Sequence, residues 1–147
     1  MRELYFSDNF FSKGITPIMD VSGQFAGELD LHSAFSTAIS VYGPDKNKLF
    51  HGRFPFFSSK WEVSNHEGNV LGRLRSRFSF GSKKYEYDAG ARGIYSIVSP
   101  MFSKLYTIEN NYGRQSATFQ QVNGWLQSRA YRLLGSKKKR TKSGITT

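Results

Sequence analysis

The sequence predicts a mainly β protein: an antiparallel β-barrel of consecutive hairpins with one C-terminal amphipathic helix. Three observations carry this prediction. Apolar and polar residues alternate through most of the chain, which is typical of half-buried strands. Segments rich in Asp, Asn and Gly recur about every 20 to 25 residues, as hairpin turns do. Aromatic residues make up 16% of the 147 residues, so a single domain has enough large apolar surface to fold.

The clearest strand lies between Val70 and Phe80. Its even positions are mostly apolar, whereas its odd positions include Arg73, Arg75 and Arg77. Because successive side chains of a strand point to opposite faces, one face is apolar and the other cationic. The same two-residue period is found in three further segments: 39–42, 61–64 and 85–88.

Turns are predicted between these strands, at segments whose residues accept positive φ or preset a turn. They are 20–23, 43–47, 65–69, 88–93 and 110–113. A short repeat follows several of them, in which a glycine stands one residue before a polar residue and two before an apolar one, in 25–29, 50–54 and 71–74. Glycine in a strand lets the strand bend or approach a neighbour closely, which a strongly coiled sheet requires.

One segment departs from the two-residue period. Between Gln120 and Leu134 the apolar residues fall at helical spacing, Asn123 is a capping residue and Gly135 a C-terminal stop. The expected stripe is Val122, Trp125, Leu126, Ala130, Leu133 and Leu134. The predicted organisation is therefore a barrel over residues 1–119, a helix over 120–135 packed in or on the barrel, and a flexible basic tail over 136–147.

Positive charge is concentrated towards the C-terminus. The net charge is +10, and the 38 residues from Asn110 onward contain eight basic and no acidic residues. Such an asymmetry indicates an anionic partner, either a phospholipid surface or nucleic acid. A basic amphipathic helix bearing Trp125 is typical of membrane interfaces, and its apolar stripe could instead dock on a protein. The predicted anion-binding residues here are Arg129, Arg132, Lys137, Lys138, Lys139, Arg140 and Lys142.

The second cationic group lies on the strand described above. Arg73, Arg75 and Arg77 share one face, where they repel one another unless an anionic ligand or acids of neighbouring strands lie opposite. Guanidinium groups suit phosphate geometry, so the three arginines are candidate anion ligands. Lys83 and Lys84 follow at the same hairpin end and are added to the set.

These hairpins resemble the tubby C-terminal-like superfamily, including its LURP-one-related and phospholipid scramblase members. The matching stretches are 18–29, 64–74 and 106–113, together with an opening strand between Leu4 and Lys13. The resemblance implies a closed antiparallel barrel around a very apolar helix. Here Arg129 and Arg132 make the candidate helix less apolar, so it either fills the barrel through its stripe or lies outside.

No enzymatic motif is found. There is no cysteine, and His32, His51 and His66 lack the spacing of a metal site, so no catalytic residue, metal or cofactor is predicted. The expected function is a non-enzymatic binding domain that docks on acidic phospholipid headgroups, with nucleic-acid binding and protein binding as alternatives. The expected location is the cytoplasm, with peripheral membrane association.

Overall fold

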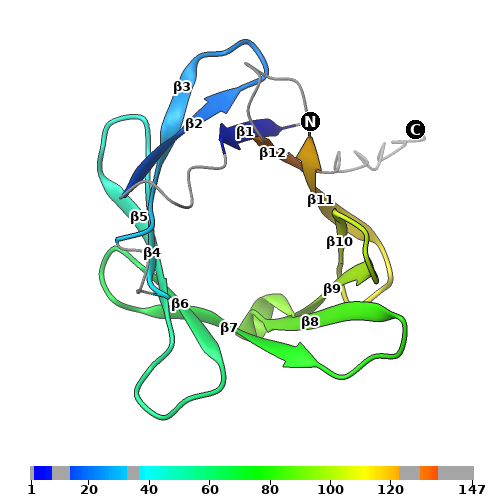
Figure 1. The fold of residues 1–147 in the computed structure, drawn as a ribbon. Coiled ribbons are helices and arrows are strands. Elements are labelled where there is room, and N and C mark those ends of the chain that lie inside the picture. Colours follow the sequence, from blue (N-terminus) through cyan, green and yellow to red (C-terminus); the bar gives the residue numbers. More distant parts are fainter. Residues whose placement is uncertain (1, 8–13, 33–36, 123–129, 136–147) are drawn as a thin grey trace, which may run out of the picture.

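The computed structural model describes residues 2–7, 14–32, 37–122 and 130–135, and it shows a closed antiparallel barrel of twelve strands (Figure 1). Each strand pairs with the next along the chain, and β12 pairs with β1 to close the barrel. The predicted antiparallel barrel is confirmed. The strands are β1 (Glu3–Ser7), β2 (Ile15–Asp20), β3 (Phe25–Asp30), β4 (Ile39–Tyr42), β5 (Lys48–Arg53), β6 (Trp61–Asn65), β7 (Val70–Arg77), β8 (Ser82–Asp88), β9 (Ile94–Pro100), β10 (Leu105–Glu109), β11 (Gln115–Val122) and β12 (Ala130–Gly135).

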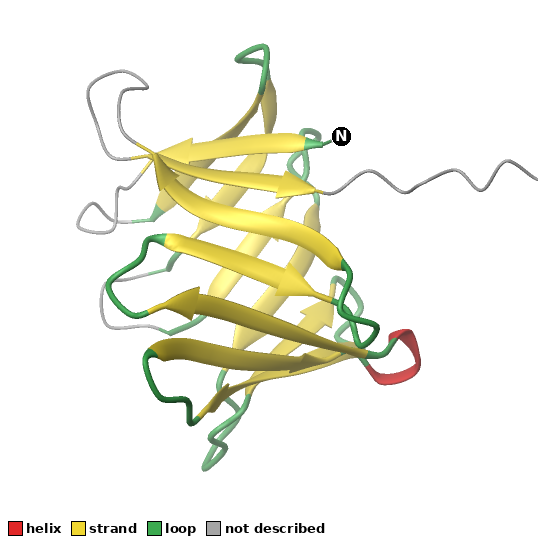
Figure 2. Ribbon diagram, turned by 90° about the vertical axis from the view of Figure 1, so that its right-hand side faces the viewer, coloured by secondary structure: helices red, strands yellow, loops and turns green. Residues whose placement is uncertain are grey.

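The two ends of the barrel differ in their connections (Figure 2). Because consecutive strands run in opposite directions, alternate connections lie at the same end. The end that carries the β2–β3, β4–β5, β6–β7, β8–β9 and β10–β11 connections is called the turn end, and it includes the short 3₁₀ helix Gly90–Arg92. The opposite end, called the loop end, carries the β5–β6, β7–β8 and β9–β10 connections. Gly135, the last described residue before the basic tail, lies at the turn end.

The turns at the turn end follow the predicted chemistry, and all five predicted turns are confirmed as hairpin connections. In the first turn a carboxylate oxygen of Asp20 accepts the backbone N–H groups of Ser22 and Gln24, each at 2.9 Å. The side chains of Asn65 and Asn110 make equivalent bonds in their own turns. A register shift accompanies these three turns, which adds local twist and helps the sheet to close.

The repeated glycines provide close approach inside the barrel. A Cβ atom at Gly52 would collide with the indole ring of Trp61, and one at Gly72 would collide with Tyr87. The Trp61 indole is held in place because its Nε1–H donates to the carbonyl of Thr37 at 3.1 Å. The predicted role of these glycines in close packing is confirmed at both positions.

We expect Gly52→Ala to lower the free energy of unfolding by about 1 to 3 kcal/mol, since the added methyl forces the Trp61 ring from its site. Chemical denaturation measures the change. Trp61→Phe removes the ring atoms that the methyl would meet, so the cost of Gly52→Ala should shrink in that background. Equal costs in both backgrounds would show that the ring is not the cause.

The predicted C-terminal helix is wrong. Val122 ends β11, and residues 130–135 form β12, which pairs with both β1 and β11. Although the apolar residues have helical spacing, residues 130–135 form a strand that closes the barrel. Without this strand, both β1 and β11 would expose an unpaired edge. The segment Tyr131–Gly135 also fits a two-residue period, with Tyr131 and Leu133 facing the lumen. Trp125, Leu126 and Arg129 lie outside the described residues.

Candidate functional site

Five phenylalanines project from the loop end. We call Phe56, Phe57, Phe78, Phe80 and Phe102 the phenylalanine rim; their exposed fractions are 88, 96, 86, 91 and 97%. Among the described residues, no other large apolar side chain is more than 85% exposed. They belong to the β5–β6, β7–β8 and β9–β10 connections, which are neighbours around the barrel. Exposed apolar patches of this kind mark interaction sites.

Two of the three loops have the same turn. In Pro55–Ser58 and in Pro100–Ser103 the N–H of the serine donates to the carbonyl of the proline, at 3.0 and 2.9 Å. In each turn the serine hydroxyl accepts the N–H two residues later, at 3.1 Å. The third residue of each turn is a phenylalanine. Both loops are therefore compact, hydrogen-bonded supports for an outward-pointing ring.

The backbone at these two phenylalanines is unfavourable for an aromatic residue. Phe57 has a φ of 59° and Phe102 a φ of 67°, in the left-handed region where glycine is usual. Each bulky residue in that region costs on the order of 1 kcal/mol. Neither ring recovers this cost by burial in the barrel, because both are almost fully exposed. Strain retained at an exposed apolar tip indicates a function for the tip.

Lysines follow each of these tips in the chain. Lys60, Lys84 and Lys104 are exposed and lie within four residues after a rim phenylalanine. The three loop segments 53–61, 77–84 and 100–105 contain six basic residues and no acidic residue. Every hairpin at the turn end, in contrast, contains an acidic residue: Asp20, Asp45, Glu67, Asp88 and Glu109. The apolar tips and an excess of basic residues therefore coincide on these three neighbouring loops.

The three predicted arginine ligands lie on the outer face of β7 and are paired with acids. Arg73 contacts Glu62 on β6 at 3.2 Å, while Arg75 and Arg77 both contact Glu86 on β8. Hydrogen bonding from Arg75, followed by the charges of Arg75 and Arg77, holds the pKa of Glu86 below its ordinary value. Acids of neighbouring strands thus balance this face, which is one of the two alternatives the charge pattern left open.

The other predicted anion ligands are separated by the fold. Lys83 faces the lumen and Lys84 the exterior, because the two are consecutive on β8. On the outer face of β12, Arg132 donates a hydrogen bond to the Gln120 side chain at 3.1 Å. The tail lysines and Arg140 lie outside the described residues, so their role stays a prediction.

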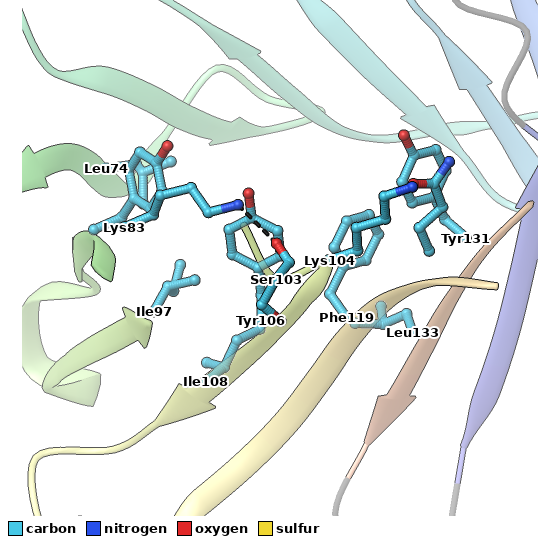
Figure 3. A pocket seen from close by; sticks show the side chains of 12 residues that line it. Leu74, Lys83, Ile97, Ser103, Lys104, Tyr106, Ile108, Phe119, Tyr131 and Leu133 are labelled. Carbon is cyan, nitrogen blue, oxygen red and sulfur yellow. Dashed lines mark hydrogen bonds between the residues drawn. The ribbon is translucent and has the colours of Figure 1, made fainter. Parts of the chain in front are cut away.

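The described strands line an apolar cavity on the inner face of the barrel. A cavity of about 540 Å³ is lined by side chains of six strands, β7 to β12, which can share one concavity only on the inner face (Figure 3). Phe119 and Tyr131 stack at 5.1 Å between ring centroids, and Phe6 stacks on both. The rings of these three residues are only half-buried. Among the apolar side chains whose burial the structure describes, only those of Ile18 and Ala89 are buried.

Cationic and polar groups stand at the loop end of this cavity. The ammonium group of Lys83 donates to the Ser103 carbonyl at 2.9 Å and lies 4.8 Å from the centre of the Tyr106 ring (Figure 3). Lys104 and Gln121 also line the cavity at this level. The lumen therefore has an apolar wall and a positive mouth inside the phenylalanine rim.

A histidine pair lies on the outer face near β4. The Ser40 hydroxyl is 2.9 Å from both His32 Nε2 and His51 Nδ1, and burial is the main cause that lowers the pKa of His51. Ser40 is 0% exposed, so its oxygen is out of reach of a substrate. Among the described residues, no group of three or more His, Cys, Asp or Glu side chains could hold a metal ion.

The fold and the site define a class: a closed twelve-stranded barrel with an apolar lumen and a cationic, aromatic end. A protein of Arabidopsis thaliana solved by X-ray crystallography is similar, with a TM-score of 0.62 over 91% of this chain and 79% of that chain. At 9% sequence identity this likeness shows the fold alone. No family model and no curated protein matches the sequence. In the described residues, no helix is long and apolar enough to cross a membrane.

Sequence reasoning missed the phenylalanine rim. The available signal was the repeat of Pro-Phe-Phe-Ser at 55–58 as Pro-Met-Phe-Ser at 100–103, in two segments between predicted strands. Each repeat precedes a lysine within two residues of its serine. The sequence pattern instead favours the core for most aromatic residues, because they mostly fall on the apolar face of predicted strands with Leu and Val.

Proposed function

We propose that this chain is a non-enzymatic binding domain that docks its loop end on a membrane surface rich in acidic phospholipid headgroups. The observation that carries the proposal is the order of residues in each of the three loops. An exposed phenylalanine lies at the tip of the loop, and a lysine follows it where the next strand begins. Membership of the tubby C-terminal-like superfamily, which the hairpin pattern resembles, is part of the proposal, as is peripheral membrane association.

The spacing of the two residue types fits the layers of a bilayer interface. Extended residues rise about 3.3 Å each, so a lysine two to four residues behind a tip stands at most about 7 to 13 Å from it. Interfacial apolar groups reach about 5 to 10 Å into the boundary between headgroups and acyl chains. Phenylalanines at that depth leave Lys60, Lys84 and Lys104 level with the phosphates, where each cation is attracted to the anionic surface.

Vesicle flotation at low salt tests the proposal. We expect the protein to float with vesicles of phosphatidylcholine and phosphatidylserine, and much less with phosphatidylcholine alone, because electrostatic attraction needs the anionic lipid. Equal binding to the two vesicles, or none to either, would contradict it.

A single-stranded oligonucleotide is the comparison ligand, since exposed aromatic rings and cations also bind unstacked bases. The rim favours a membrane because its five rings are divided among three neighbouring loops that project from the same end of the barrel. If the oligonucleotide binds through the rim and vesicles do not, the site belongs to nucleic acid and the membrane proposal is wrong.

A further inference from the structure

We propose that the barrel lumen is a binding site for the acyl chain of an anionic lipid, with the carboxylate or phosphate of that lipid held at Lys83. This inference deepens the proposed function, because it names a lipid that the docked barrel would take up. It rests on the cavity wall, the cation at the mouth and the position of the mouth within the phenylalanine rim.

The wall has the chemistry of an acyl site. The 540 Å³ cavity lies within the range of about 300 to 1,000 Å³ that is usual for small-molecule sites. A second cavity of about 370 Å³ shares Leu74, Ile97 and Ile108 with it and continues the lumen past Trp61. Half-exposed rings such as Phe119 and Tyr131 gain free energy when an apolar group removes them from water.

The mouth supplies the charge complementarity. Lys83 is the inward-facing lysine of β8, and its ammonium keeps donor capacity beyond the bond to the Ser103 carbonyl. Its position over the Tyr106 ring fixes it at the level where the apolar wall ends. A ligand with a long apolar chain and one terminal anion can therefore contact the apolar wall and form an ion pair with Lys83. A neutral chain contacts the wall but forms no ion pair with this lysine.

The place of the mouth indicates how such a ligand enters. Ser103 and Lys104 line the cavity and belong to the same loop as the rim residue Phe102. When the rim lies in the membrane interface, the lumen opens on the layer that contains lipid chains, so a chain can transfer without crossing water. A free fatty acid and a phospholipid share this chemistry, and the experiment separates them.

Binding of fatty acids of increasing length tests the site in the full chain. In a Trp125→Phe background Trp61 is the only tryptophan, and it reports occupation of the deeper cavity. Using octanoate, decanoate and dodecanoate below their micelle concentrations, we expect saturable binding that tightens about fourfold per added methylene. An affinity that does not depend on chain length would overturn the proposal. The absence of saturable binding would also overturn it, and this is the result expected if a segment of this chain covered the wall.

Lys83→Met is the decisive variant, with Lys84→Met as its matched control on the opposite face of the same strand. We expect Lys83→Met to weaken dodecanoate binding by about tenfold or more and to leave dodecanol binding unchanged, whereas Lys84→Met changes neither. Leu133→Trp fills the lumen and should abolish both. Equal effects of the two lysine variants would also overturn the site.

Two further measurements complete the test. Fatty acid and a short-chain phosphatidic acid are compared at equal chain length, so preference for one identifies carboxylate or phosphate as the anion. Flotation with anionic vesicles should persist in Lys83→Met, because the rim and its three exposed lysines are intact. If vesicles bind and fatty acids do not, the lumen site is wrong and the docking proposal stands.

Discussion

Replacing Phe57 and Phe102 together by glycine is expected to weaken vesicle binding by on the order of 100-fold or more while making the barrel more stable. Transfer of a phenylalanine side chain from water is worth about 1.5 to 3 kcal/mol, so each ring contributes at least about tenfold to partitioning. Both residues have positive φ, which glycine adopts without strain, so the free energy of unfolding should rise by about 1 kcal/mol per site. Vesicle co-sedimentation and chemical denaturation measure the two effects.

This double variant is informative because vesicle binding is expected to fall while the free energy of unfolding is expected to rise. An unfolded or misfolded protein would lose both binding and stability, whereas loss of a docking surface lowers binding alone. Tyr112→Ser is the matched control, because Tyr112 is 81% exposed but lies at the turn end. We expect it to bind vesicles like the unchanged protein. A comparable loss from Tyr112→Ser would mean that exposed aromatic area in general, and not the rim, holds the protein on the vesicle.

Neutralising three lysines behind the rim is the second large effect. We expect Lys60→Gln, Lys84→Gln and Lys104→Gln in one protein to weaken binding to anionic vesicles by on the order of 100-fold at low salt, since each basic residue near such a surface contributes about fivefold. Binding should also depend less steeply on salt, because fewer charges remain to be screened. Flotation over a series of salt concentrations measures both.

The control changes the same charge at the other end. Lys46→Gln, Lys48→Gln and Arg114→Gln remove three exposed cations from the turn end, where acids alternate with bases. Net charge falls equally in both triple variants, so any difference between them reports orientation. If the two bind vesicles equally, attraction depends only on net charge, and the loop end is not the docking face.

The hairpin architecture could be predicted because its signals are local. A two-residue period shows which side of a strand is apolar, and Asn or Asp three residues before a Gly is typical of a tight turn. The turns at Asp20, Asn65 and Asn110 therefore appear where the residues indicate. The glycines beside Trp61 and Tyr87 were also predictable as points of close approach, although the rings that they accommodate are distant in the chain.

The last strand could not be predicted by the same reasoning. Residues 130–135 fit both a helical stripe and a two-residue period, and local preference does not decide between them. The decision comes from β1 and β11, whose free edges need a partner between them. Similarly, the charge pattern showed three arginines on one face, but only strand register shows that Glu62 and Glu86 are placed to balance them.

Taken alone, the sequence determined that this chain forms a rolled antiparallel sheet with an excess of positive charge, because alternation, turn chemistry and composition are properties of neighbouring residues. Tertiary structure decided what the aromatic residues do. Closure of twelve strands places three loops at one end, so their phenylalanines form a rim beside lysines, and it turns Phe119, Tyr131 and Lys83 into the wall and mouth of one lumen. Those arrangements depend on which strands meet across the barrel, and pairing between distant segments leaves no period in the sequence.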